Sequence, residues 1–292
     1  MPKNVIIGCG YVGERLARVL LEQGQSVCGV VQSAASLARL TAAGIPALRY
    51  DLTGSAADSV PLALAGTHLF HFAPPPASGT EDTHTRQLIA AFEHTGHPSR
   101  LVYISTTGVY GDCGGAWVDE EWPTEPTLAR SQRRLDAETQ LRRWSQASGG
   151  ELVILRVAGI YGPERLPLER LQRGLPLVRS EEAPYSNRIH VDDLVTICVA
   201  AMAHGRNGAI FNVSDGHPST MTAYFLQIAE LAGLPAPPLI SMADAAAQLS
   251  EGMMGYMSES RRLSNRRLRE ELGVTLHYPT LREGLAQVLN RA

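Results

Sequence analysis

The sequence predicts an α/β protein with a parallel sheet covered by helices on both faces, and a smaller α+β region toward its C-terminus. Three observations lead to this prediction. A glycine-rich turn joins a short apolar run to an amphipathic segment within residues 4–23. Apolar runs and helical patterns then alternate through the first half of the chain, which is typical of βαβ units. After Tyr161 the elements shorten and prolines separate them.

The first strand, expected at Asn4–Ile7, runs directly into G-x-G-x-x-G, and the first helix is expected at Val12–Gln23. In this context each glycine has a role: a tight turn, close approach of the backbone to a pyrophosphate, and close packing of helix and strand. The helix N-terminus would hold the anion. We therefore predict a doubly wound, Rossmann-type sheet that binds a dinucleotide; the alternative is a purely structural turn. The residues expected to hold the dinucleotide here are Gly8, Cys9, Gly10, Tyr11, Val12 and Gly13.

The later strands are nearly continuous apolar runs, as expected where helices cover both sheet faces. These strands are Ser26–Val31, Ala47–Tyr50, His68–Phe72, Leu101–Ser105, Leu152–Arg156 and Ala209–Val213. The helices between and after them are Ala35–Ala43, Thr80–Thr95, Pro126–Ser148 and His190–Met202. We expect residues 1–162 to form a dinucleotide-binding domain, to which 187–215 return. Residues 163–186 and 216–292 would form the substrate domain.

Composition limits the function classes. Of the 292 residues, 44% are hydrophobic and 19% charged, which suits a chain with a substantial core. The net charge of −3 argues against nucleic acid, and the basic run 261–269 is bracketed by acids, which predicts a solvated helix. No apolar stretch could span a bilayer, no leader precedes the first strand, and the four cysteines are far apart. We therefore expect a cytoplasmic protein, a monomer or homodimer, without a membrane partner.

The end of the second strand indicates which dinucleotide binds. A carboxylate there would bind the ribose 2′-hydroxyl and select NAD. The chain instead has Gln32 and Ser33, which can donate to a 2′-phosphate, so we expect NADP, with NAD as the alternative; these two residues could equally form a solvated polar loop. Further cofactor contacts are expected after the third and fourth strands, from Asp51, Leu52, Ala73 and Pro74.

The fifth strand and several later segments resemble the extended short-chain dehydrogenase/reductases, the NAD-dependent epimerase/dehydratase family. The resemblance covers essentially the whole chain. It rests on Tyr103–Asp112, Leu155–Pro163, Asn187–Leu194, Phe211–Asp215, Glu271–Gly273 and Tyr278–Leu285. It implies a dinucleotide-binding core, a C-terminal substrate domain and substrates that are often nucleotide sugars.

The resemblance breaks at the helix after the fifth strand. The family uses a Tyr-x-x-x-Lys pair there, and a nearby hydroxyl that polarises the substrate; Thr106 occupies the hydroxyl position. Aligned on the following Leu-x-x-Glu, Arg130 replaces the tyrosine and Arg134 the lysine. Arginine stays protonated, so it cannot move a proton at neutral pH. The chain therefore resembles atypical members of the family.

Residues 130, 134, 137, 141 and 144 fall on one helical stripe. We expect this stripe to face the sheet, which would turn Arg130 and Arg134 inward toward an anion: a cofactor phosphate, an acidic substrate, or Glu120 or Glu121. Alternatively the helix begins later and both arginines are solvated.

Tyr110 is a candidate proton donor, although the turn it occupies more often uses an aromatic residue for packing. A metal site is not expected, because His190 and its aspartates fit a structural loop, and His68 and His71 point to opposite faces of a strand. Two functions remain. The first is an NAD(P)-dependent oxidoreductase or epimerase-dehydratase-like enzyme with an anionic small-molecule substrate. The second is a non-catalytic NADP-binding sensor.

Overall fold

The computed structural model describes residues 4–54 and 62–290, which form two compact units. The first unit holds the described residues up to Val109, with Pro126–Arg156 and Val195–Phe211. The second holds Tyr110–Glu125, Val157–Leu194 and the described residues from Asn212.

The domain boundaries differ from those expected at three segments, one of which is 157–162, because the second unit already begins again at Val157. Tyr110–Glu125 packs in the second unit, because the strand β6 (Trp117–Val118) pairs with β15 (Arg262–Leu263) near the C-terminus. Of the segment 187–215, only Val195–Phe211 returns to the first unit.

A seven-stranded sheet has the order β12-β7-β5-β4-β1-β2-β3. Its strands are β1 (Asn4–Ile7), β2 (Val27–Val31), β3 (Ala47–Arg49), β4 (His68–His71), β5 (Arg100–Thr106), β7 (Glu151–Val157) and β12 (Ile210–Val213). The pairs that join β3, β2, β1, β4 and β5 are all parallel. The strand order reverses at β1, and ligands of doubly wound sheets bind at such a point.

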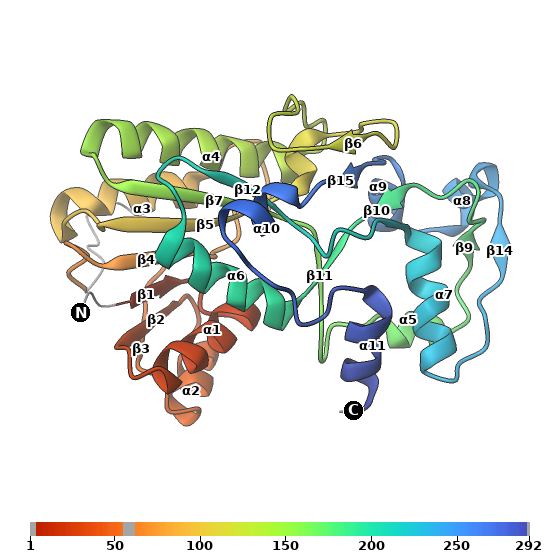
Figure 1. The fold of residues 1–292 in the computed structure, drawn as a ribbon, viewed down its shortest axis with the longest axis horizontal. Coiled ribbons are helices and arrows are strands. Elements are labelled where there is room, and N and C mark those ends of the chain that lie inside the picture. Colours follow the sequence, from red (N-terminus) through yellow and green to blue (C-terminus); the bar gives the residue numbers. More distant parts are fainter. Residues whose placement is uncertain (1–3, 55–61, 291–292) are drawn as a thin grey trace. The chain divides into compact units, whose positions relative to one another are not determined.

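Helices cover both faces of this sheet (Figure 1). They are α1 (Tyr11–Glu22), α2 (Ala34–Ala42), α3 (Thr83–Thr95), α4 (Ala129–Ser148) and α6 (Val191–His204). Val5 and Ile7 of β1 lie in one core cluster with residues of α3 and α4. Ile6 points the other way, toward Gly13 of α1. Because neighbouring strand residues face opposite sides, a continuous apolar strand needs a helix layer on each face.

The second unit combines short strand pairs with helices, so the predicted α+β character is confirmed. The pairs are β8 (Gly159–Tyr161) with β11 (Arg188–His190), β9 (Leu177–Val178) with β14 (Leu239–Ile240), β10 (Tyr185–Ser186) with β13 (Ser219–Thr220), and β6 with β15. The helices are α5 (Leu168–Gln172), α7 (Met221–Leu231), α8 (Met242–Gln248), α9 (Glu251–Met257), α10 (Arg266–Glu271) and α11 (Leu281–Asn290). Tyr161, Phe225, Ile228 and Leu285 belong to its separate core.

The predicted strands and helices of the first half are confirmed, with ends that move by a few residues. The largest shifts are at two helix starts: α3 begins at Thr83 rather than Thr80, after its N-cap Asp82, and α4 begins at Ala129 rather than Pro126. Within the described residues, no helix is long and apolar enough to cross a membrane.

Candidate functional site

The glycine turn brings the ends of β1 and β4 into direct contact. Gly8 has φ +82°, and a Cβ at this position would lie 2.4 Å from the backbone nitrogen of Ala73. A Cβ at Gly13 would lie 3.0 Å from Ile6, which packs α1 closely on β1. Only glycine fits both the positive φ and the space at position 8. This is the geometry of a dinucleotide-binding turn.

The N-terminus of α1 is open to an anion. Gly10 occupies the N-cap and has no side chain that could accept a first-turn amide, whereas Ser33 caps α2 and Asp82 caps α3. The first intrahelical bond runs from the Glu14 amide to the Gly10 carbonyl at 2.8 Å. Uncapped first-turn amides and the helix dipole favour a phosphate at this end. The residues present therefore fit a dinucleotide.

The Cys9 side chain points into the core, although the sequence placed this residue among the cofactor-binding positions. It is fully buried against Gly29, and burial raises the pKa of the thiol to about 12. The Cys9 amide already donates to the Val30 carbonyl at 3.1 Å. Tyr11 and Val12 remain half-buried at the start of α1.

At the other end of the site, the polar groups after β2 are already engaged. Gln32 Nε2 donates to Asp51 Oδ1 at 3.1 Å, and Ser33 Oγ accepts the Ser36 amide as the α2 cap. Arg39, a possible phosphate ligand, forms an ion pair with Glu14. A 2′-phosphate at Gln32 would therefore meet the Asp51 carboxylate.

The segment after β4 lies against the glycine turn. Ala73 is buried against Gly8, and Pro74 is exposed, with its carbonyl accepting from the His84 ring at 2.9 Å. Leu52, after β3, is buried and packs in the core rather than at the surface.

Thr106 is the last residue of β5, and Arg134 contacts the same strand two and three residues earlier. Arg134 Nη1 donates to the Ile104 carbonyl at 3.1 Å and to the Tyr103 hydroxyl at 3.2 Å. Thr106 Oγ1 accepts the Gly108 amide at 3.2 Å, at the start of the short 3-10 turn Thr107–Tyr110. Among residues 4–54 and 62–290, no carboxylate lies within ion-pair distance of Arg134. An uncompensated guanidinium at this edge favours an anionic ligand.

Arg130 differs from the prediction, because it is exposed rather than turned toward the sheet. The helix begins at Ala129, so Arg130 lies in its first turn at the surface. Glu120 and Glu121, the carboxylates suggested as partners, lie in the second unit beside Arg267, with N–O distances of 3.8 and 2.8 Å.

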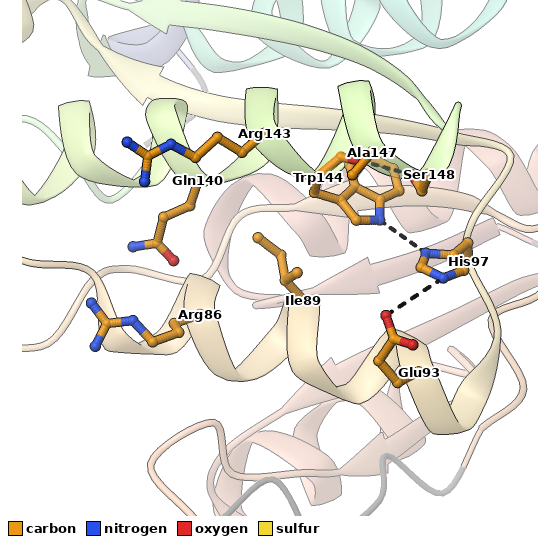
Figure 2. A pocket seen from close by; sticks show the side chains of 9 residues that line it. All are labelled: Arg86, Ile89, Glu93, His97, Gln140, Arg143, Trp144, Ala147 and Ser148. Atoms are coloured by element: carbon orange, nitrogen blue, oxygen red, sulfur yellow. Dashed lines mark hydrogen bonds and ion pairs between the residues drawn. The ribbon is translucent and has the colours of Figure 1, made fainter.

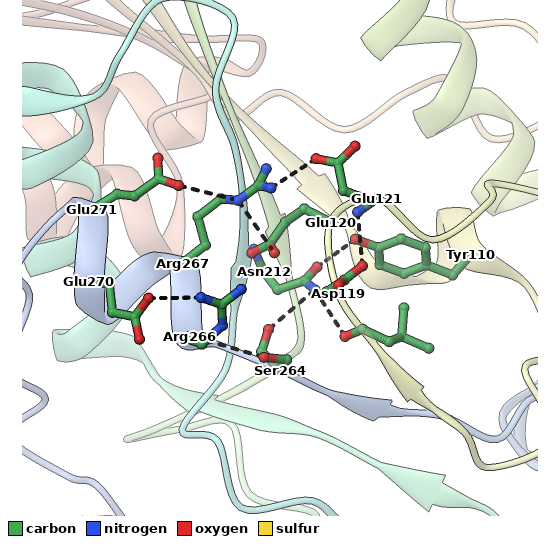
Figure 3. Close-up of polar contacts among 11 residues, drawn as sticks. Tyr110, Asp119, Glu120, Glu121, Asn212, Ser264, Arg266, Arg267, Glu270 and Glu271 are labelled. Atoms are coloured by element: carbon green, nitrogen blue, oxygen red, sulfur yellow. Dashed lines mark hydrogen bonds and ion pairs between the residues drawn. The ribbon is translucent and has the colours of Figure 1, made fainter.

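Tyr110 is a packing residue in this structure. It is 2% exposed, and its hydroxyl donates to Asn212 Oδ1 at 2.7 Å (Figure 3). The backbone amide of Asn212 donates to Glu120 Oε1 at 2.7 Å. The Tyr110 proton therefore already belongs to a buried network, so the geometry does not support a role as proton donor.

The basic run near the C-terminus is compensated. Arg266 pairs with Glu270 at 3.0 Å, and Arg267 lies beside Glu121 and Glu271 (Figure 3). The prediction of one solvated helix over 261–269 is wrong, because Arg262–Leu263 forms the strand β15 and only the residues from Arg266 onward are helical, in α10.

Sequence reasoning missed a buried ion pair below β5. Glu138 is fully buried, accepts the Ser105 hydroxyl at 2.6 Å, and pairs with Arg156 at 2.9 Å. It also missed Arg133, which is 8% exposed and donates to the Gly79 carbonyl at 2.5 Å. Arg133 does not belong to the helical stripe that was predicted to face the sheet, so the apolar periodicity did not indicate that it is buried.

In the second unit, the buried Asp215 lies next to Arg188, whose carbonyl accepts the Asp215 amide at 2.8 Å. Arg188 stacks 4.2 Å from the Tyr224 ring, and Nη1 donates to the Asn187 carbonyl at 2.8 Å. Asp215 is 5% exposed; its Oδ1 accepts the His217 amide at 2.9 Å, but its Oδ2 has no hydrogen-bond partner. Burial raises the pKa of Asp215 to about 7, although Arg188 opposes the shift.

The raised pKa predicts a pH-dependent stability. Between about pH 4 and pH 7 the folded chain keeps the Asp215 proton that the unfolded chain releases, so the free energy of unfolding falls as pH rises. A shift of this size corresponds to about 2–4 kcal/mol. We expect Asp215→Asn to remove this part of the dependence in urea unfolding at about pH 5 and about pH 8. Parallel pH profiles for the two proteins would contradict the assignment.

A groove of about 450 Å³ lies between α3 and α4, lined in part by Arg86, Ile89, Arg143 and Trp144 (Figure 2). Trp144 Nε1 donates to His97 Nδ1 at 3.1 Å on its wall. None of the predicted site residues lines it, so we do not regard it as the candidate site. In the part of the chain that the structure describes, no cluster of three His, Cys, Asp or Glu residues could hold a metal ion.

Comparison with known proteins places these features in context. A sequence model of the NAD dependent epimerase/dehydratase family matches residues 5–214. The dTDP-D-glucose 4,6-dehydratase of Homo sapiens is 23% identical over 137 residues, which cover 44% of this chain and 39% of that protein. The match thus spans about two-fifths of the length of that curated relative.

Solved structures resemble the whole chain, among them the following two. A functionally unknown conserved protein from Silicibacter pomeroyi DSS is 34% identical, with a TM-score of 0.83, and the match covers 100% of this chain and 99% of that one. UDP-glucuronic acid 4-epimerase from Bacillus cereus, in complex with UDP-glucuronic acid and NAD, is 18% identical with a TM-score of 0.77, covering 99% and 98%. At that identity the second likeness concerns the fold.

Proposed function

Because this chain belongs to the NAD-dependent epimerase/dehydratase family, we propose that it is an NAD(P)-dependent enzyme acting on a small anionic substrate. The observation that carries the proposal is the pairing of two features in the first unit. The glycine turn that follows β1 fits a pyrophosphate. Arg134, near the carboxyl end of β5, is a guanidinium without a carboxylate partner among the described residues. Both lie at the carboxyl ends of sheet strands, where doubly wound folds bind ligands.

The substrate class follows from charge. Arg134 has five N–H donors, and only Nη1 donates to protein acceptors among the described residues. The remaining donors suit a phosphate or carboxylate. The Bacillus cereus neighbour was solved with UDP-glucuronic acid, which supports a nucleotide-linked sugar as the substrate to be tested first.

The contacts of the residues after β2 change the expectation that the chain binds NADP. Gln32 and Ser33 were the candidates for a 2′-phosphate, but each already has a partner within the first unit. The Asp51 carboxylate beside Gln32 repels a phosphate and can accept from a hydroxyl. We therefore expect NAD to bind at least as tightly as NADP.

When bound, the nicotinamide ring supplies hydride transfer. The chain's own contribution is positional. Thr106, at the end of β5, would orient the substrate oxygen through its hydroxyl, and Arg134 would hold the negative charge beside it. Arginine cannot exchange a proton at neutral pH, so Arg134 acts by binding and orientation.

A second function is favoured by one observation. The sequence resemblance predicts that Arg130 and Arg134 replace the family's tyrosine and lysine, and the Tyr110 hydroxyl already donates to Asn212. A protein with this arrangement would bind the coenzyme without turnover and act as a sensor or interaction module. The same experiment separates the two functions.

The test is a titration of the purified chain with NAD⁺, NADH, NADP⁺ and NADPH, followed by sugar nucleotides added to the coenzyme complex. Tryptophan fluorescence reports binding, and nicotinamide absorbance reports turnover. We expect Arg134→Ala to weaken the binding of the anionic ligand by about tenfold or more. Arg143→Ala is the control, because this exposed residue lies on the same helix and faces the α3–α4 groove.

Three outcomes decide the matter. Turnover with a sugar nucleotide supports the enzyme. Tight coenzyme binding without turnover on any substrate supports the sensor. Absence of affinity for all four coenzymes contradicts both.

A further inference from the structure

A chain of buried polar side chains lies beneath Arg134 in the first unit. Asp82, Thr85, His71 and Tyr103 are each fully buried. Thr85 Oγ1 lies 3.0 Å from Asp82 Oδ2, and His71 Nε2 lies 2.9 Å from Thr85 Oγ1. The His71 and Tyr103 rings pack with centroids 5.2 Å apart. Two hydrogen bonds and one ring contact thus connect the four buried side chains, and Tyr103 at the end of this chain contacts the Arg134 guanidinium.

The direction of the hydrogen bonds determines the state of His71. The Asp82 carboxylate can only accept, so the Thr85 hydroxyl donates its proton to Oδ2. Thr85 Oγ1 must then accept from His71 Nε2–H, which makes Nε2 the protonated nitrogen of the ring. His71 Nδ1 is buried without a hydrogen-bond partner. The ring is therefore neutral, and burial together with the Arg134 charge lowers its pKa to about 3.

A neutral ring at this position matters for Arg134. A protonated His71 would repel the guanidinium, whereas the neutral ring only packs against Tyr103. Tyr103 then offers its hydroxyl to Arg134 Nη1 at 3.2 Å, and the same nitrogen donates to the Ile104 carbonyl at 3.1 Å. Two acceptors on one nitrogen leave Nε and Nη2 for other partners. The buried atoms that lack a hydrogen-bond partner include none of Arg134, which indicates that these donors reach the surface.

We propose that Tyr103 is a positioning residue, whose hydroxyl holds Arg134 Nη1 so that Nε and Nη2 face an anionic group of the ligand. The Asp82–Thr85–His71 chain keeps the Tyr103 ring in place. This inference rests on the proposed function, since it requires Arg134 to bind a ligand anion. The anion is a phosphate or carboxylate, supplied by the coenzyme or by the substrate.

The experiment is a double-mutant cycle on the full chain with Tyr103→Phe, Arg134→Ala and the double variant. Two probes separate the sources of the anion: NAD⁺ alone, and UDP-glucose added to the NAD⁺ complex. Tyr103→Phe keeps the ring and removes one acceptor. In whichever titration Arg134→Ala has its effect, we expect Tyr103→Phe to weaken binding by about tenfold. The double variant should bind no more weakly than Arg134→Ala alone.

The matched control is Tyr161→Phe in the second unit, where an equally buried hydroxyl has no hydrogen-bond partner. It should leave both dissociation constants unchanged. Losses that add in the double variant would overturn the positioning role, as would a Tyr103→Phe protein with unchanged affinity while Arg134→Ala binds weakly. If the unsubstituted chain bound neither probe, the proposed function itself would fail. If only the role proposed for Tyr103 is wrong, the unsubstituted chain still binds at least one of the two probes, so the two results can be distinguished.

Discussion

Replacing Gly8 with alanine is expected to abolish coenzyme binding. The new Cβ would lie 2.4 Å from the Ala73 nitrogen and 2.7 Å from the Phe72 carbonyl carbon, and both are backbone atoms that no rotamer change can move aside. The residue would also have to hold φ +82°. We expect the dissociation constant for NAD⁺ to rise by about a hundredfold or more, and stability to fall by about 2 kcal/mol or more.

The matched control is Gly24→Ala. Gly24 has φ +72° in the same unit, but a Cβ there would have no neighbour within 4 Å. This variant carries the backbone strain without the clash, so it should lose about 1–2 kcal/mol and keep its coenzyme affinity. A Gly8→Ala protein that binds NAD⁺ as well as Gly24→Ala would show that this turn does not hold the pyrophosphate.

Replacing Glu138 with alanine is expected to destabilise the folded chain strongly. It leaves the Arg156 guanidinium, whose side chain is 3% exposed, without its carboxylate at 2.9 Å. Removing one partner of a buried ion pair costs about 3–5 kcal/mol, because the other charge stays buried without that counterion. The Ser105 hydroxyl also loses its acceptor at 2.6 Å. Urea unfolding measures the loss.

Two further variants separate this effect from a general loss of charge. Glu169→Ala removes one partner of an exposed pair with Arg173, where the side chains are 87% and 64% exposed, and should change stability by less than about 1 kcal/mol. Glu138→Leu combined with Arg156→Met removes both buried charges and should recover much of the loss. If the double variant were less stable than Glu138→Ala, the buried charge would not be the cause.

The first strand, the glycine turn and the first helix could be predicted from sequence because their signals are local. A β-branched run, three glycines at fixed spacing and a helical apolar stripe lie within 20 consecutive residues, and each acts on the backbone nearby. The same is true of the alternating strands and helices, whose ends moved by only a few residues.

The side chains of the candidate site were harder to predict. Cys9 was predicted among the cofactor-binding residues, and the direction of its thiol could not be predicted, because it packs against Gly29 on a strand that the sequence alone does not place beside it. Arg130 and Arg134 look equivalent on a helical stripe, yet the helix start exposes one and turns the other inward. Tyr103 has the pattern of an ordinary strand residue, yet its hydroxyl accepts from Arg134, 31 positions away.

The glycine turn between a strand and a helix follows from the amino-acid sequence alone, because the required φ angles and the missing side chains are properties of single residues. The layered α/β architecture follows from the sequence as well, since the apolar runs need cover on both faces. Which charges are compensated depends instead on the folded arrangement of the chain. Arg39 meets Glu14, Arg156 meets Glu138, and Arg134 meets no carboxylate among the described residues, because such contacts depend on which strands and helices become neighbours.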